Sequence, residues 1–227
     1  MTERLIAAGR TAEVYDMGNG RVRRHYLVDL TTEREARLMT YLRGQGFPVP
    51  EVFDADGPDM VMERVEGPSM FAAVTRRPWT VFRQAALLAE LHERLHAITA
   101  PEWLEAPLGE GTTVVHLDLH PLNVMLSPDG PVVIDWTGSI RGRAATDLAM
   151  TWVLMWTSEI PGRRVERLVG RAGQKLFTGS FLRRVDGPAA AAELRTVGAH
   201  RVVDPTVTEG ERANIHALVA KQASPKA

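Results

Sequence analysis

The chain has 227 residues, of which 44% are hydrophobic and 24% are charged, the proportions of a folded globular protein with one sizeable domain or two small ones. The formal net charge of −1 gives no reason to expect a nucleic-acid partner, and no stretch approaches the roughly 18 apolar residues that cross a bilayer. The absence of cysteine excludes disulfides, a thiol nucleophile and a cysteine-ligated zinc site, and with the charged N-terminal segment it favours a cytoplasmic protein.

The stretch up to Glu66 predicts a small antiparallel sheet. Two segments, "GRTAEVYDM" and "GRVRRHYLV", flank Gly18-Asn19-Gly20, a pattern typical of two strands joined by a tight hairpin turn. The segment "FPVPEVFDADGPDMVMERV" then predicts two more short strands with a turn near Asp56-Gly57-Pro58.

One helix is predicted between these two pairs of strands, in "TTEREARLMTYLRG". Thr31 or Thr32 is expected to cap its N-terminus, because a threonine hydroxyl can accept a hydrogen bond from the first free backbone amides. The spacing of the apolar residues turns one face of the helix to the core. The expected core residues are Ala36, Met39 and Leu42, and Gly44 is expected to end the helix.

After Pro68 the pattern becomes mainly helical. "WTVFRQAALLAELHERLHAI" has apolar residues at positions 81, 85, 88, 91, 95 and 98, which predicts a long amphipathic helix. Two short strands, "NVML" and "PVVID", follow around a turn at Ser127-Pro128-Asp129-Gly130. "ATDLAMTWVLMW" is apolar on nearly all sides, which predicts a buried helix. We therefore expect two domains, residues 1–66 and 67–227.

The segment "HLDLHPLNVML", residues 116–126, contains polar side chains of the types that a phosphoryl-transfer site needs. Such a reaction needs a carboxylate to orient the acceptor hydroxyl and oxygen ligands to hold Mg²⁺ on the phosphates. Asp118 and Asn123 lie in this segment, and Asp135 ends the strand "VVID". A hairpin of this length is expected to bring Asn123 and Asp135 together at one mouth.

The longer segment "HLDLHPLNVMLSPDGPVVIDW" resembles the catalytic region of aminoglycoside phosphotransferase-like small-molecule kinases. The resemblance implies an α+β, protein-kinase-like fold, with a small antiparallel-sheet N-lobe and a mainly helical C-lobe. It implies that Asp118 is the catalytic carboxylate and that Asn123 and Asp135 are Mg²⁺ ligands. His116 would tie the loop down, and Asp147 in "ATDLA" would brace it from the buried helix.

Upstream segments extend the resemblance, which covers roughly residues 9–155. "GRTAEVY" resembles a loose glycine-rich phosphate loop, and "VMERVEG" resembles the lobe-connecting segment whose backbone binds adenine. In the first predicted helix, Glu35 stands where the family has its ion-pairing glutamate, and Glu33 is the alternative. The residues thus implied to bind nucleotide are Gly9, Thr11, Val14, Val22, Arg24, Glu35, Glu63 and Val65.

Three positions depart from the family pattern. No lysine precedes Lys175, so the strand lysine that grips the nucleotide phosphates is missing, and we carry its role to Arg24, with Arg23 as the alternative. Leu117 replaces a common glycine between the histidine and the aspartate. Thr137 stands where an acidic residue often follows the Asp-Trp pair.

The sequence also allows other roles for these polar residues. Asp118 and Asn123 are also typical of a polar loop stitched by its own hydrogen bonds. His116 and His120 are candidate metal ligands, but no cysteine is available to complete a zinc site. Residues 92–96, "HERLH", match the H-E-x-x-H motif, which predicts two histidine ligands on one helix face and Glu93 as the general base of a zinc hydrolase.

The function predicted from the sequence is Mg²⁺-dependent transfer of the terminal phosphoryl group of ATP or GTP to a hydroxyl of a small molecule. Residues 1–140 hold 13 Lys/Arg against 20 Asp/Glu, whereas residues 141–227 hold 14 against 8. This excess of positive charge in the C-terminal part favours a neutral or anionic acceptor over a polycationic one. A nucleotide-binding pseudokinase and a kinase acting on a protein are the alternatives. No membrane or nucleic-acid partner is expected.

Overall fold

The computed structural model describes residues 3–9, 11–158 and 163–223. Contacts between residues divide the chain into two compact units, Met1–Met70 with Leu122–Thr137 and Phe71–Pro121 with Gly138–Ala227. The predicted division between residues 66 and 67 treats the chain as two consecutive domains. Residues 122–137, which contain the second predicted hairpin, instead make their contacts within the first unit.

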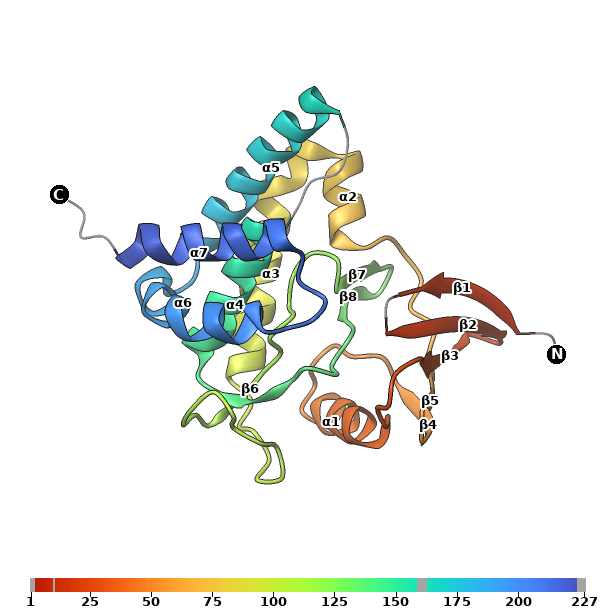
Figure 1. The fold of residues 1–227 in the computed structure, drawn as a ribbon. Helices are drawn as coiled ribbons and strands as arrows, with labels where there is room; N and C mark the ends of the chain where they lie inside the picture. Colours follow the sequence, from red (N-terminus) through yellow and green to blue (C-terminus); the bar gives the residue numbers. More distant parts are fainter. Residues whose placement is uncertain (1–2, 10, 159–162, 224–227) are drawn as a thin grey trace. The chain divides into compact units, whose positions relative to one another are not determined.

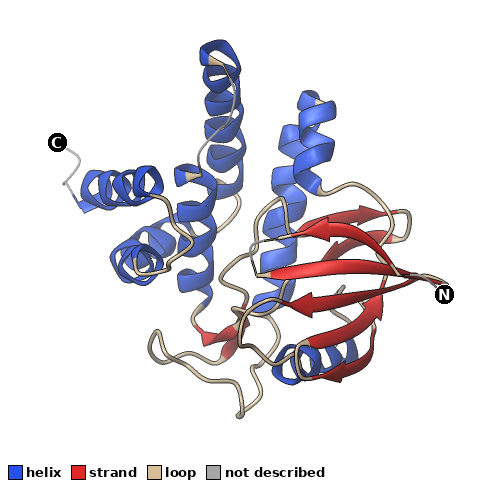
Figure 2. Ribbon diagram, turned by 45° about the vertical axis from the view of Figure 1, so that its right-hand side comes forward, coloured by secondary structure: helices blue, strands red, loops and turns tan. Residues whose placement is uncertain are grey.

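The first unit contains a five-stranded antiparallel sheet in the order β1-β2-β3-β5-β4 (Figures 1 and 2). Its strands are β1 (Arg4–Ala8), β2 (Ala12–Gly18), β3 (Arg21–Tyr26), β4 (Val52–Asp56) and β5 (Asp59–Glu63). The last four confirm the predicted strands. β1 was not predicted, because all five of its residues are exposed and its sequence lacks the alternation that marks a half-buried strand.

The β2–β3 turn confirms the predicted hairpin. Gly18, Asn19 and Gly20 have φ angles of 76°, 52° and 71°. Glycine and asparagine adopt this left-handed region at low cost, which is why such residues select tight hairpin turns. The register pairs Val14 with Arg24 across the two strands.

Helix α1 (Glu33–Gly44) lies beside β4 in the first unit (Figure 1). Ala36, Met39 and Leu42 are buried as predicted. Thr32 occupies the N-cap position, but its hydroxyl donates to the carbonyl oxygens of Gly57 and Asp59 at 3.1 and 2.9 Å and makes no capping hydrogen bond. The predicted capping role of Thr32 is therefore wrong, because tertiary contacts with the β4–β5 turn take its hydroxyl.

A separate hairpin of β7 (Val124–Ser127) and β8 (Gly130–Val133) completes the first unit and confirms the two predicted strands. The Leu126 amide donates to the Pro68 carbonyl at 2.9 Å, and the Val133 amide donates to the Pro48 carbonyl at 2.8 Å. These bonds hold the hairpin against the segments before α2 and β4.

The second unit is mainly helical. Its elements are α2 (Met70–Arg76, whose first residue is counted with the first unit), the 3₁₀ turn Pro78–Thr80, α3 (Val81–His96), α4 (Ala144–Thr157), α5 (Arg164–Leu182), α6 (Gly187–Val202) and α7 (Glu209–Ala223), with the strand pair β6 (Thr113–Val115) and β9 (Ile140–Gly142). Helix α4 is buried along nearly its whole length, as predicted, and packs against α5, α6 and α7. Among the described residues, no helix is long and apolar enough to span a membrane.

Candidate active site

The loop after β6 is anchored to the buried helix α4. The Asp147 carboxylate, fully buried, accepts hydrogen bonds from the His116 amide at 3.2 Å and the Leu117 amide at 2.8 Å. The Thr151 hydroxyl, one helical turn further along α4, donates to the Leu119 carbonyl at 2.9 Å. Hydrogen bonds from α4 to the backbone therefore hold residues 116, 117 and 119 in place.

Asp147 is kept ionised by its surroundings. Burial alone would raise the pKa of its carboxyl, but the hydrogen bond from His96 Nε2 at 2.9 Å and the nearby imidazoles hold that pKa well below its usual range. A carboxylate is a stronger acceptor than a neutral acid, so the anchoring bonds to the loop amides are charge-assisted.

The anchored backbone presents the Asp118 carboxylate towards solvent. Leu117 has a φ of 61°, a left-handed conformation that a leucine adopts only when its surroundings impose it. The Asp118 amide donates to His116 Nδ1 at 3.2 Å, and the side chain of Asp118 is 37% exposed. His120 Nε2 lies 3.4 Å from Asp118 Oδ1. A partly exposed carboxylate on a fixed backbone is suited to orient an incoming hydroxyl.

The H-E-x-x-H residues serve the packing of α3 instead of forming a metal site. His92 is buried, with Nδ1 at 2.9 Å from the Leu88 carbonyl oxygen and Nε2 at 2.9 Å from Thr151 Oγ1, so both ring nitrogens face polar atoms of the protein. His96 uses Nε2 on Asp147. Within the described residues, no group of three or more His, Cys, Asp or Glu side chains could hold a metal ion. The zinc-hydrolase hypothesis therefore gains no support from the structure.

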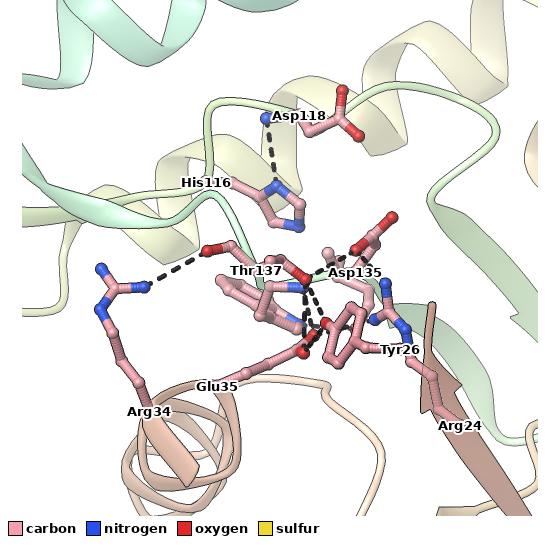
Figure 3. Close-up of polar contacts among 10 residues, drawn as sticks. Arg24, Tyr26, Arg34, Glu35, His116, Asp118, Asp135 and Thr137 are labelled. Atoms are coloured by element: carbon pink, nitrogen blue, oxygen red, sulfur yellow. Dashed lines mark hydrogen bonds and ion pairs between the residues drawn. The ribbon is translucent and has the colours of Figure 1, made fainter. Parts of the chain in front are cut away.

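In the first unit, Arg24 joins two carboxylates that lie far apart in the sequence (Figure 3). Its Nη1 donates to Glu35 Oε1 on α1 at 3.0 Å, and its Nη2 donates to Asp135 Oδ1 after β8 at 2.8 Å. Arg24 and Glu35 are 9% and 3% exposed. Burial by itself would lower the pKa of Arg24, but the two carboxylates outweigh it and raise that pKa above its usual range, so the guanidinium stays charged.

Arg23 and Glu33, the alternatives to Arg24 and Glu35, make other contacts. Arg23 points to the other face of β3, where it pairs with Glu3 and Asp59, each at 2.5 Å. Glu33 accepts a hydrogen bond from the Gly57 amide at 2.9 Å at the start of α1. Arg24 and Glu35 thus form the ion pair, and Arg23 lies on the opposite face of β3.

The β7–β8 hairpin brings Asn123 beside Asp135, as expected. The amide of Ile134, the residue before Asp135, donates to the Asn123 carbonyl at 3.0 Å. Asp135 has a φ of 69°, and the Thr137 hydroxyl lies 3.3 Å from its Oδ1. An amide oxygen and a carboxylate on adjacent backbone segments are donors of the hard-oxygen type that Mg²⁺ prefers, so the residues present fit that ion.

The remaining residues implied to bind nucleotide are spread over the sheet of the first unit. The amide of Gly9, between β1 and β2, donates to the Ala12 carbonyl at 2.8 Å, and the Leu27 amide donates to the Thr11 carbonyl at 2.8 Å. Val14 lies on β2, and Val22 is buried on β3.

Glu63 and Val65 lie at and just after the end of β5. The Glu63 amide donates to the Glu51 carbonyl at 2.8 Å. The Val65 amide has no hydrogen-bond partner among residues 3–9, 11–158 and 163–223. This part of the backbone therefore offers a donor to a ligand.

Three residues of the Arg24 cluster, Tyr26, Trp136 and Thr137, were not predicted as site residues from the sequence. Tyr26 donates a hydrogen bond from its hydroxyl to Glu35 Oε2, and its Oη lies 2.5 Å from Thr137 Oγ1 (Figure 3). The Trp136 amide also donates to Glu35 Oε1, at 2.9 Å. The alternation along β3 already put Tyr26 on the face of Arg24, and this signal could have identified it.

Comparisons with known proteins identify the family and the fold of the chain. The model of the phosphotransferase enzyme family matches residues 3–111 and 73–185. No curated protein sequence matches the chain. Among solved structures, the chain is similar to a choline/ethanolamine kinase family protein from Mesorhizobium loti, with 14% identity, a TM-score of 0.59, and coverage of 99% of this chain and 89% of that one.

Aminoglycoside phosphotransferases are similar too. ADP-bound APH(2'')-Ib has 13% identity and a TM-score of 0.61, with 96% of this chain and 92% of that one covered. The aminoglycoside-3'-phosphotransferase of type VIII has 22% identity and a TM-score of 0.51, with 96% and 91% covered. These identities establish the fold and no substrate. Because the family model spans most of the chain and the same fold recurs across these kinases, the chain belongs to the phosphotransferase enzyme family and has a protein-kinase-like fold.

Proposed function

We propose that the protein transfers the terminal phosphoryl group of ATP, or of GTP, to a hydroxyl group of a small molecule in the cytoplasm, with Mg²⁺ as cofactor. The observation that carries the proposal is the Arg24 cluster, in which a permanently charged guanidinium is held between Glu35 and the metal-ligand candidate Asp135. A cation fixed beside oxygen ligands for Mg²⁺ is the charge arrangement that nucleotide phosphates need. One similar structure contains ADP, and a similar amicoumacin kinase was solved with AMP-PNP and Ca²⁺. Both support the use of a nucleotide by this protein.

Each part of the reaction has residues suited to it. Asn123 and Asp135 would hold the metal, which supplies a positive charge that neutralises the phosphates when bound. Arg24 would add a second positive charge, the backbone around Gly9 and Thr11 would line the phosphates, and the Val65 amide would donate to the adenine ring.

Asp118 would accept a hydrogen bond from the acceptor hydroxyl and orient its oxygen towards the phosphorus. The phosphorus–oxygen bond to the new ester forms as the bond to the nucleoside diphosphate breaks, and the hydroxyl proton passes to the Asp118 carboxylate. His116 and Asp147 would act through the backbone, by keeping that carboxylate in place. Most of the rate acceleration would then come from positioning and charge neutralisation.

A screen for nucleotide consumption tests this function. Purified protein is incubated with Mg·ATP or Mg·GTP and a panel of hydroxylated metabolites and antibiotics, and release of nucleoside diphosphate is measured. We expect at least one acceptor to be phosphorylated, and we expect Asp118→Ala to lower turnover by about 10²- to 10⁴-fold while nucleotide binding persists.

The matched control is Asp129→Ala, which removes an exposed aspartate from the β7–β8 turn. This variant should keep normal turnover. Near-normal phosphoryl transfer by Asp118→Ala would overturn the assignment of the catalytic carboxylate.

A nucleotide-binding pseudokinase is the second candidate, favoured by the arginine at the lysine position. It predicts Mg·ATP binding without turnover on any hydroxylated acceptor of the panel. The ionised Asp147 and the loop that it fixes around Asp118 favour the enzyme instead, since a binding protein has no need of a fixed catalytic carboxylate.

A further inference from the structure

Tyr26 supports Arg24 in two ways. Residues 24 and 26 share one face of β3, and the guanidinium carbon of Arg24 lies 4.8 Å from the centroid of the Tyr26 ring. The hydroxyl of the same ring donates to Glu35 Oε2, while Arg24 binds Glu35 Oε1. Tyr26 is 3% exposed, so water does not compete for either contact.

The hydroxyl of Thr137 extends this support to Asp135. Thr137 Oγ1 lies 2.5 Å from Tyr26 Oη and 3.3 Å from both Glu35 Oε2 and Asp135 Oδ1. Each hydroxyl has one proton. With the Tyr26 proton on Glu35, the Thr137 proton is shared between Tyr26 Oη and Asp135, which links the two carboxylates through hydroxyl groups. A carboxylate in place of Thr137 would instead repel Glu35.

Arginine needs this support more than lysine does. An ammonium group is a compact point charge that works in many orientations, whereas a guanidinium is a planar fork whose donors must be aimed. Here the two Nη atoms reach carboxylates on two different elements, α1 and the segment after β8. The Tyr26 ring lies against the guanidinium, and Glu35 is held at both of its carboxylate oxygens. Together these contacts restrict the guanidinium to the plane in which it reaches both Glu35 and Asp135.

We propose that Tyr26 is a positioning residue for Arg24: its ring and hydroxyl, with Thr137, hold the guanidinium in the plane that lets an arginine do the phosphate-binding work of a lysine. This inference rests on the proposed function, because it assigns the cluster to the binding of nucleotide phosphates. Tyr26 itself touches neither the nucleotide nor the acceptor in this scheme.

Two substitutions separate the contributions of Tyr26. Tyr26→Phe keeps the ring and removes the hydroxyl, and Tyr26→Leu removes both. Each is made in the natural chain and in the Arg24→Lys variant, and the dissociation constant of Mg·ATP is measured by titration calorimetry, with the unfolding midpoint of each variant as a check on folding.

The matched control is Tyr15→Phe. Tyr15 repeats the arrangement elsewhere on the sheet: its hydroxyl donates to Glu13 Oε2 at 2.5 Å, and the Arg23 guanidinium carbon lies 4.7 Å from its ring centroid. Tyr15 pairs with Arg23, on the face of the sheet opposite Arg24, so this variant should bind Mg·ATP as the natural chain does.

In the natural chain, we expect Tyr26→Phe to weaken Mg·ATP binding about threefold to tenfold and Tyr26→Leu to weaken it further. In the Arg24→Lys variant, the same substitutions should change the dissociation constant less than about twofold, because an ammonium needs no planar guide. Thr137→Val should weaken binding in the same direction as Tyr26→Phe, and Thr137→Ser should restore it.

Unchanged binding by Tyr26→Phe, or an equal loss in Tyr15→Phe, would overturn the inference and leave the proposed function standing. Losses of equal size in the natural chain and in the Arg24→Lys variant would also overturn it, since Tyr26 would then act independently of the guanidinium. Absence of Mg·ATP binding by the natural chain would contradict the proposed function itself, together with the inference. If Tyr26→Leu does not fold, Tyr26→Phe still decides the outcome.

Discussion

Leu117 and Asp135 both have left-handed backbones, at φ 61° and 69°. For a residue with a Cβ atom, this conformation costs roughly 1–2 kcal/mol, so the surroundings must impose it. At Leu117 the Asp147 carboxylate holds the amide, and after Asp135 the Glu35 carboxylate holds the amide of Trp136. Leu117 thus precedes the proposed catalytic carboxylate, and Asp135 is itself a proposed metal ligand. In both places a buried carboxylate, Asp147 or Glu35, holds the backbone in its left-handed conformation.

Leu117 allows the backbone strain to be measured. We expect Leu117→Gly to be more stable than Leu117→Ala by about 1 kcal/mol, because both remove the isobutyl group but only glycine is free of the left-handed penalty. Chemical denaturation of the two variants measures the difference. At Leu122, which has no positive φ, the order should reverse and alanine should be the more stable. If Leu117→Ala were the more stable variant, the left-handed backbone at position 117 would not be strained.

At the same scale, the sequence predicted residues whose chemistry is local and missed those that depend on tertiary contacts. Asp118, Asn123 and Asp135 were predicted from the oxygen-bearing side chains that phosphoryl transfer needs and from the family resemblance of one continuous segment. Arg24 followed from the period of two along one strand. The contact of Tyr26 with Thr137 joins residues 111 positions apart, and no local pattern encodes it.

Among the elements, the β7–β8 hairpin depends on a close approach at Gly67. This glycine has a φ of 125°, and a Cβ atom placed on it would lie 2.2 Å from the Leu126 carbonyl oxygen, a backbone atom that cannot move aside. The next residue, Pro68, accepts the hydrogen bond from the Leu126 amide. The close approach of Gly67 to the Leu126 carbonyl therefore requires a residue without a side chain at position 67.

We expect Gly67→Ala to lower the free energy of unfolding by about 3 kcal/mol or more, through both the clash and the strained φ. The control is Gly57→Ala in the β4–β5 turn, where φ is 53° but no atom lies within 4 Å of the added Cβ. This control pays only the conformational cost, roughly 1 kcal/mol. Equal losses of stability in the two variants, measured by urea denaturation, would show that the contact with Leu126 is unimportant.

Elements with strong periodicity were predicted from the sequence, and the others were not. Helices α1, α3 and α4 and strand β3 follow their patterns, because one face or the whole element is buried. Strands β2, β4 and β5 are less buried, and the glycine-containing turns beside them marked them in the sequence. The strand β1 and the helix α2 have little buried surface to mark them. Helices α5, α6 and α7 lie beyond the last recognisable motif, and the packing of α6 and α7 on α4 is a property of the fold that the sequence did not reveal.

Across the whole molecule, the chain runs from the first unit to the second and back again before it ends in the second. Residues 116–121 are anchored in the second unit by Asp147, while residues 122–137 pair within the first. The proposed catalytic carboxylate and the proposed metal ligands are thus carried by different units but joined by a short stretch of chain. The two units are defined by contacts between residues, whereas the boundary predicted from the sequence follows the order of the chain.

The global stability should fall on mild acidification, and His92 supplies the reason. Burial lowers the pKa of this imidazole to about 4, against an ordinary value near 6.5 in the unfolded chain. Between these two values the unfolded state binds a proton that the folded state does not. The contribution of His92 is therefore fully present above about pH 6.5 and is lost as the pH falls towards 4.

The expected loss is on the order of 3 kcal/mol between pH 6.5 and 4, with a slope of up to about 1.4 kcal/mol per pH unit. Asp147 acts in the same direction at still lower pH, because its folded pKa is also depressed. Urea denaturation at a series of pH values measures the slope, and His92→Gln, which keeps hydrogen-bonding groups but cannot titrate, should flatten it above pH 4. A slope that stays the same in His92→Gln would show that other groups control the acid stability and that the buried His92–Thr151 contact tolerates a charged imidazole.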